Sequence, residues 1–135
     1  MSAVAGFRRR LTLLLQQARD KIQATVNAVR RAVGQDRYEN ANRELESAFQ
    51  TSLEAFNIVG QANEVWGQLA AIDPPKGETA FPELVRALQQ CAEVSLYISH
   101  GREVVFYRLV WPLRDSNAYR NALLTFFGLR LNLDG

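Results

Sequence analysis

The chain has 135 residues, of which 47% are hydrophobic and 22% charged, and its formal net charge is +2 at pH 7. This length corresponds to about one domain with a buried core, and the composition indicates a globular rather than a disordered protein. A single cysteine excludes an intrachain disulfide and a cysteine-based metal centre, so we expect a reducing, intracellular compartment. No segment is apolar enough over about 20 residues to predict a membrane span.

The charges are unevenly distributed along the chain. Residues 1–43 carry nine Lys or Arg and three Asp or Glu, whereas residues 44–93 carry two and eight. Residues 94–135 carry five and three. A basic segment followed by an acidic one indicates which parts of the chain lie side by side, or which kind of partner each part faces.

Two long helices are predicted in the first half of the chain. Apolar residues recur every three or four positions over residues 4–33, which predicts an amphipathic helix that ends at Gly34. A second helix is expected to begin at Asp or Asn caps within residues 36–40 and to end at Ile72, before two prolines. The short turn between them predicts an antiparallel hairpin over residues 1–72, about 45–50 Å long. The hairpin therefore either projects from the domain or is covered by a second copy or another subunit.

The second helix is expected to carry one apolar stripe that includes its bulky side chains. Gly60 and Gly67 each weaken this helix by roughly 1 kcal/mol relative to alanine, which suggests close packing against another backbone or local bending. Phe56 and Trp66 are candidate protein-interface residues. The predicted stripe consists of Ala41, Leu45, Ala48, Phe49, Leu53, Phe56, Val59, Ala62, Trp66 and Leu69.

Residues 79–135 are expected to form a C-terminal helical subregion of the same single domain. Thr79 is the predicted cap of a third helix that has Pro82 in its first turn. Residues 102–111 fit a buried strand or a continuing helix, and we favour the helix. The apolar positions of the third helix are Phe81, Leu84, Val85, Leu88, Cys91, Ala92 and Leu96.

A last helix is predicted from Ser116 to Gly128. Residues 129–133 alternate in polarity, which is typical of a short strand that needs a partner. Trp111, which precedes a proline, is a further candidate anchor for a protein contact because tryptophan is enriched at interfaces. The predicted fold is thus all-α over residues 1–135, with a long N-terminal hairpin, two or three shorter C-terminal helices and an alternative of a short β tail.

No motif for catalysis or cofactor binding occurs. The sequence has one histidine, His100, which is expected beside Gly101 at a helix end, where a histidine caps the last carbonyls. Glu44 and Glu46 lie two positions apart on the second helix and point to different sides, so they do not form an acid–base pair. The sequence predicts no enzyme activity, no cofactor, no metal and no small-molecule substrate.

The first helix carries arginines that favour two different functions. At 100° per residue, Arg8, Arg19 and Arg30 follow one edge of the apolar stripe at intervals of about 16 Å, a spacing that suits phosphates along a nucleic acid. Arg9 and Arg31 are expected to face outward. The candidate nucleic-acid site consists of Arg8, Arg9, Arg19, Arg30, Arg31 and Arg37.

The same cations also suit a helix–helix contact. Arg10 and Lys21 border the opposite edge of the stripe, and the second helix carries the acids that a basic first helix needs across an antiparallel contact. Exposed pairs of this kind contribute only about 0–1 kcal/mol each. We favour this charge-matched hairpin over nucleic-acid binding.

The segment KIQATVNAV, residues 21–29, followed by QDRYENANRELES, residues 35–47, is similar to the RNA-silencing suppressors of nodaviruses. These are small dimeric proteins that lay paired helices along double-stranded RNA, and the similarity covers roughly a third of the chain. The second helix of that family carries basic residues toward RNA, whereas the matching stretch here has Glu54 and no Lys or Arg after Arg43. Residues 79–135 have no counterpart there. The resemblance implies a double-stranded RNA binder as the alternative function.

The sequence therefore predicts a non-catalytic helical assembly protein. Its amphipathic helices are expected to dock another copy, as a dimer, or a partner subunit. The alternative is a protein that binds double-stranded RNA or DNA through its basic N-terminal helix.

Overall fold

The computed structural model describes residues 2–74 and 81–127, which are almost entirely helical. No strand occurs in these two ranges, so the predicted all-α fold is confirmed. The proposed β tail at 129–133 lies outside the described residues. The elements in chain order are α1 (Ala3–Val33), α2 (Tyr38–Ile72), α3 (Pro82–Val105), the π-helical η1 (Phe106–Val110), the 3₁₀-helical η2 (Trp111–Leu113) and α4 (Ala118–Phe127).

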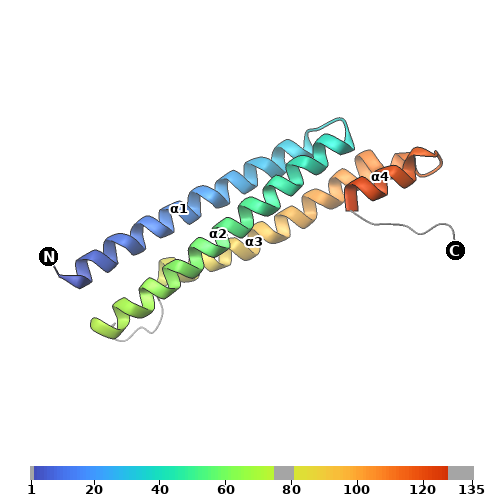
Figure 1. Cartoon of the computed structure of the whole chain (residues 1–135). Coiled ribbons are helices and arrows are strands. Elements are labelled where there is room, and N and C mark those ends of the chain that lie inside the picture. The colour runs from blue at the N-terminus through green and yellow to red at the C-terminus, as the bar shows by residue number, and fades with distance from the viewer. Residues whose placement is uncertain (1, 75–80, 128–135) are drawn as a thin grey trace.

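The helices form an elongated bundle. α1 and α2 make the predicted antiparallel hairpin, and α3 returns alongside both of them (Figure 1). At 1.5 Å per residue, the 31 residues of α1 and the 35 residues of α2 span roughly 46 and 52 Å. α4 packs at the end of the bundle that holds the α1–α2 turn (Figure 1). The third helix of the same chain thus covers one side of the long hairpin.

Several helix ends follow the sequence signals. The Ser2 hydroxyl accepts a hydrogen bond from the Ala5 N–H at 3.2 Å, which caps α1, and Gly34 ends that helix as predicted. Pro82 lies in the first turn of α3, and the Ser116 hydroxyl accepts a bond from the Ala118 N–H at 3.3 Å at the start of α4.

Other helix ends differ from prediction. The residue that caps α2 is Arg37, whose side chain makes no capping bond, so the expectation of an Asp or Asn cap was wrong. The residue that precedes α3 is Phe81, and Thr79 lies outside the described residues. α2 is held by packing along its length, and a side-chain cap is not required for it to start.

Small residues dominate the part of α2 that packs inside the bundle. Phe49, Leu53 and Phe56, three members of the predicted apolar stripe, are exposed in the single chain. Small side chains let three long helices approach closely, and the bulky residues are left on the outside. The buried residues of α2 are Ala41, Asn42, Leu45, Ala48, Ala55, Val59, Ala62, Val65 and Leu69.

Glycines show where the helices approach most closely. A Cβ on Gly101, in the last part of α3, would lie 2.6 Å from Val29 Cγ1 of α1. Because α3 continues through Gly101 to Val105, the prediction that His100 sits at a helix end was wrong. A Cβ on Gly60 or Gly67 would have no heavy atom within 4 Å, so the expected close packing at these two glycines does not occur within the described part of this chain.

The C-terminal elements close one end of the bundle. Residues 102–111 are helical, as favoured from the sequence, although the helix widens into a π turn at η1. The Arg108 guanidinium donates to the carbonyl oxygens of Val33 and Gln35, at the end of α1. Phe126 of α4 is 1% exposed and forms the centre of this small core.

Candidate interaction surfaces

Three ion pairs line the contact between α1 and α2. Lys21 Nζ lies 2.7 Å from Glu54 Oε2, and Arg31 Nε lies 3.1 Å from Glu44 Oε2. At the open end of the hairpin, Arg8 Nη2 lies 3.0 Å from Asp73 Oδ2. The charge-matched hairpin predicted from the sequence is therefore confirmed, and it explains part of the charge segregation.

One of these pairs corrects a prediction. The helical period predicts that Arg31 faces outward, but its guanidinium bends back across the seam to Glu44. The reason is the tight turn that follows Val33, which brings the first turns of α2 beside the last turn of α1, within reach of a long side chain. Arg31 therefore has a partner within the chain.

The six predicted nucleic-acid arginines do not form one row. Arg8 and Arg31 are paired with acids of the hairpin's second arm, whereas Arg19 and Arg30 face the groove between α1 and α3. Arg9 and Arg37 are exposed near opposite ends of α1. The sequence could not anticipate this division because it depends on which side of α1 is covered by α3.

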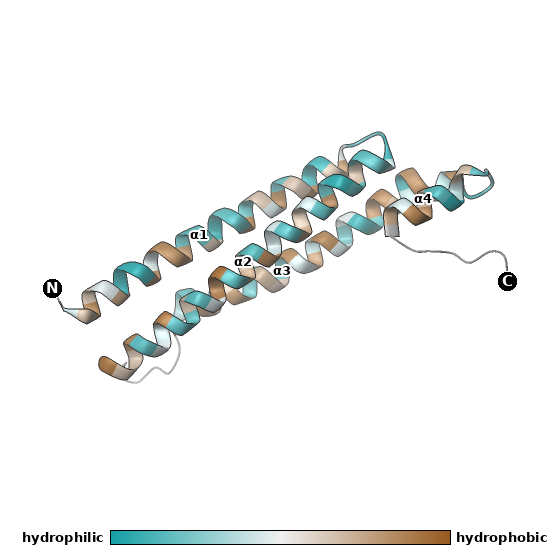
Figure 2. Ribbon diagram, viewed as in Figure 1, coloured by the Kyte–Doolittle hydropathy of each residue, from teal (hydrophilic) through white to brown (hydrophobic). Residues whose placement is uncertain are grey.

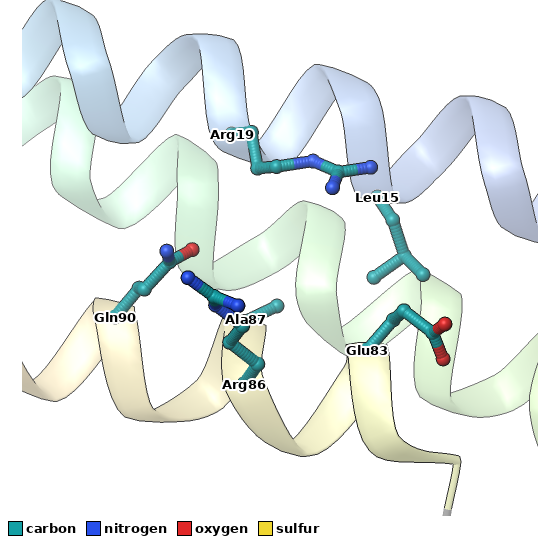
Figure 3. A pocket seen from close by; sticks show the side chains of 6 residues that line it. All are labelled: Leu15, Arg19, Glu83, Arg86, Ala87 and Gln90. Atoms are coloured by element: carbon teal, nitrogen blue, oxygen red, sulfur yellow. The ribbon is translucent and has the colours of Figure 1, made fainter.

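The groove between α1 and α3 has mixed charge. At one end, the side chains of Arg19 and Arg86 extend toward the space between the two helices, and Gln90 lies beside Arg86 (Figure 3). Leu15 and Ala87 form the floor there, and Glu83 is at the rim. The next hollow, about 390 Å³ in volume, is lined by Ile22, Val26, Arg30, Gln90, Glu93, Val94 and Tyr97. Cations and acids alternate along this groove, so it does not present a surface of one sign.

The groups that most often carry chemistry are isolated. Cys91 is buried, and this burial raises the pKa of its thiol. His100 is exposed on α3. Within residues 2–74 and 81–127, no three His, Cys, Asp or Glu side chains are placed to hold a metal ion. None of the helices in those ranges is long and apolar enough to cross a bilayer.

A second apolar surface runs along the outside of the bundle. Its six large residues are exposed by between 40% (Val85) and 72% (Leu96), and Phe56 is exposed by 59%. Of this surface the sequence identified only Phe56 as an interface residue, because inner and outer apolar positions merge into one broad stripe when helical spacing alone is considered. We call it the outer face; it consists of Phe49, Leu53 and Phe56 on α2 and of Val85, Leu88, Ala92 and Leu96 on α3.

Helical geometry places the α2 row of the outer face away from α1. At 100° per residue, Phe49 and Phe56 lie on the side of the buried stripe opposite Glu44 and Glu54. Those two glutamates contact α1 through their ion pairs. The α2 row therefore lies on the α3 side of α2 and on its exposed surface.

The α3 row also points away from α1. Glu83, Arg86, Gln90, Glu93 and Tyr97 border the α1 groove. At 100° per residue, Leu88, Ala92 and Leu96 lie on the other side of the buried residues of α3 and face the outside of the bundle.

Two contacts show which residues of α2 and α3 lie side by side along the bundle axis. A Cβ on Gly101 would lie 3.8 Å from Leu45 Cδ2, and the Trp66 ring stacks on Phe81 at 5.3 Å between centroids. Between these points the antiparallel helices place Phe56 level with the turn of α3 that holds Leu88. Hydrophobic segments occur on both α2 and α3 in this part of the bundle (Figure 2).

The other predicted interface residues have contacts within the chain. Trp66 is half-buried in the stack with Phe81. Trp111 is exposed on one side, but the Arg114 guanidinium lies 4.8 Å from its ring centroid, and Tyr119 meets it edge to face at 6.4 Å. Of the three predicted residues, Phe56 is the most exposed.

Comparison of the chain with protein-family models, curated proteins and solved structures finds no match. The fold alone defines the class, an all-α helical bundle with an apolar outer face.

Proposed function

We propose that this protein is a non-catalytic assembly subunit that docks another protein chain through its outer face. The observation that carries the proposal is the inversion in α2, where four of the six alanines are buried and both phenylalanines are exposed. The fold of the single chain gives no reason for three large apolar side chains at these exposed positions. Burial against another chain supplies that reason.

The size of the outer face supports a protein partner. At roughly 200 Å² for a side chain of this kind, its six large residues expose on the order of 600 Å² of apolar surface. A standard interface buries about 800 Å² on each partner, so a modest polar rim completes it. This area is at the upper end of the range for the largest apolar patch of a single chain, about 300–600 Å², and such patches are often functional.

The charge of α2 supports the same partner class. From Glu44 to Ile72 the helix contains acids but no Lys or Arg. Charged residues are depleted at the centres of protein interfaces, and the outer face has none among its seven residues. A nucleic acid would require cations at this position.

The test is the replacement of Phe49 and Phe56 by glutamine in the full chain. Burying each phenylalanine is worth about 1.5–3 kcal/mol, so we expect the dissociation constant of the assembly to rise at least about 100-fold in sedimentation equilibrium. Leu13→Gln is the matched control, because Leu13 is 57% exposed but lies on α1. An assembly that F49Q/F56Q and L13Q weaken equally would contradict the proposal.

Double-stranded nucleic acid is the second candidate function. The observation in its favour is that Arg19 and Arg30 form no ion pair with any acid in the described part of the chain. The same sedimentation run with a short RNA duplex tests it. If this candidate holds, R19Q/R30Q lowers the slope of log affinity against log salt by roughly 0.7–0.9 for each phosphate that the arginines no longer bind, and F49Q/F56Q leaves that slope unchanged.

A further inference from the structure

We infer that the partner on the outer face is a second copy of this chain, related by a two-fold axis near Leu53, with the two α2 helices antiparallel. The inference rests on the proposed docking function and adds the identity and orientation of the partner. It is carried by the arrangement of side chains along α2 and α3.

The row on α2 is nearly symmetric about its centre. Phe49 lies four positions before Leu53 and Phe56 lies three positions after it. In a two-fold contact the same patch occurs on both subunits, so residue i meets j and j meets i. An axis near Leu53 places Phe49 of one copy against Phe56 of the other and brings the two Leu53 side chains together. Each bulky side chain then finds an apolar partner.

Three of the four residues on α3 are symmetric about a point at the same level, and Val85 lies outside this symmetric set. Leu88 and Leu96 each lie four positions from Ala92. The Leu45–Gly101 and Trp66–Phe81 contacts place Ala92 about level with Leu53. One axis therefore serves both rows, and the small side chain at Ala92 leaves room beside it. Two separate helices that share one centre of symmetry favour a second copy over an unrelated partner.

Gly60 provides a separate observation on this side of α2. It lies one turn beyond Phe56, and no heavy atom of the described chain comes within 4 Å of the position of its missing Cβ. An exposed glycine inside a helix weakens that helix, and no contact within the described part of the chain requires a glycine at this position. An antiparallel partner helix that runs along this row meets no side chain at Gly60.

The area and charge also suit a homodimer. Two copies of the outer face together bury on the order of 1,200 Å², which is the lower limit of a standard interface. The seven residues of the face are uncharged, so like charges do not meet at the axis. A charge near the axis would face the same charge of the other copy, and Leu53 and Ala92 place none there.

Cysteine cross-linking of the full chain tests the inference. In a Cys91→Ala background, which removes the native thiol, single cysteines replace Leu53, Phe49 or Phe56. We expect L53C to form a disulfide-linked dimer on oxidation, because a residue near a two-fold axis meets itself within the distance that a disulfide spans. F49C mixed with F56C should cross-link, whereas F49C alone should not.

Other outcomes overturn the inference in distinguishable ways. Cross-linking of F49C with itself and of F56C with itself would show parallel helices. A sedimentation mass of one chain for the pure protein, together with capture of another protein that F49Q/F56Q abolishes, would overturn the second copy and leave the docking face in place. No effect of F49Q/F56Q on any assembly would overturn both proposals.

Discussion

The two apolar faces of α2 differ in the size of their side chains. Four of the nine buried residues of the inner face are alanine, and its largest side chains are leucines. The outer face carries Phe49, Leu53 and Phe56. In the single chain, α2 therefore leaves both of its phenylalanines exposed to water.

The difference separates what stabilises the single chain from what remains for a partner. Alanine on the inner face lets α1, α2 and α3 approach closely, and close packing maximises dispersion contacts among long helices. Large side chains at these positions would push the helices apart. The outer face contributes little to the stability of one chain, so its apolar character calls for a role outside that chain.

The largest effect is expected at the inner face. Leu45 is fully buried, and Leu45→Ala should lower the free energy of unfolding by about 2–5 kcal/mol because it leaves a cavity between α2 and α3. Urea denaturation followed by circular dichroism measures this loss. Leu53→Ala is the matched control on the outer face and should change the unfolding free energy of dilute protein by less than about 0.5 kcal/mol. Equal losses would remove the distinction between the two faces.

A smaller effect is expected from two glycines. Gly101→Ala places a methyl group 2.6 Å from Val29 Cγ1, and the resulting overpacking should cost about 1–3 kcal/mol. Gly60→Ala adds the same atom where no neighbour exists in the described chain, and it should raise the unfolding free energy of dilute protein by about 0.5–1 kcal/mol. Thermal melts of both variants provide the comparison. A stabilising Gly101→Ala would show that α3 does not pack this closely on α1.

The smallest effect is expected at the charged seam. Glu54→Gln removes the ion pair with Lys21, and it should cost about 0–1 kcal/mol at low salt because both side chains are about half exposed. The loss should shrink as salt rises, since screening weakens the native pair. Glu64→Gln, on the same helix and without an ion pair to any described cation, is the control. A loss above about 2 kcal/mol would contradict the interpretation of the Lys21–Glu54 contact as an ordinary exposed ion pair.

Much of the fold could be predicted from the sequence. Regular apolar spacing, Gly34 and the prolines after Ile72 define the two long helices and the hairpin, because helix formation and termination depend on nearby residues. The segregation of charge also predicted ion pairs across the hairpin. Arg31 shows the limit of this reasoning, since its partner Glu44 lies across a turn whose geometry the helical period does not describe.

The sequence by itself determined that the chain is all-α and that its first two helices pair. The tertiary structure decided which apolar residues are inside. On α2 the candidates for burial cover more of the helix circumference than two neighbouring helices can contact, so α1 and α3 select the side with alanine and leave Phe49, Leu53 and Phe56 exposed. That selection depends on how closely three backbones can approach, which is a property of the packed helices and not of any one segment.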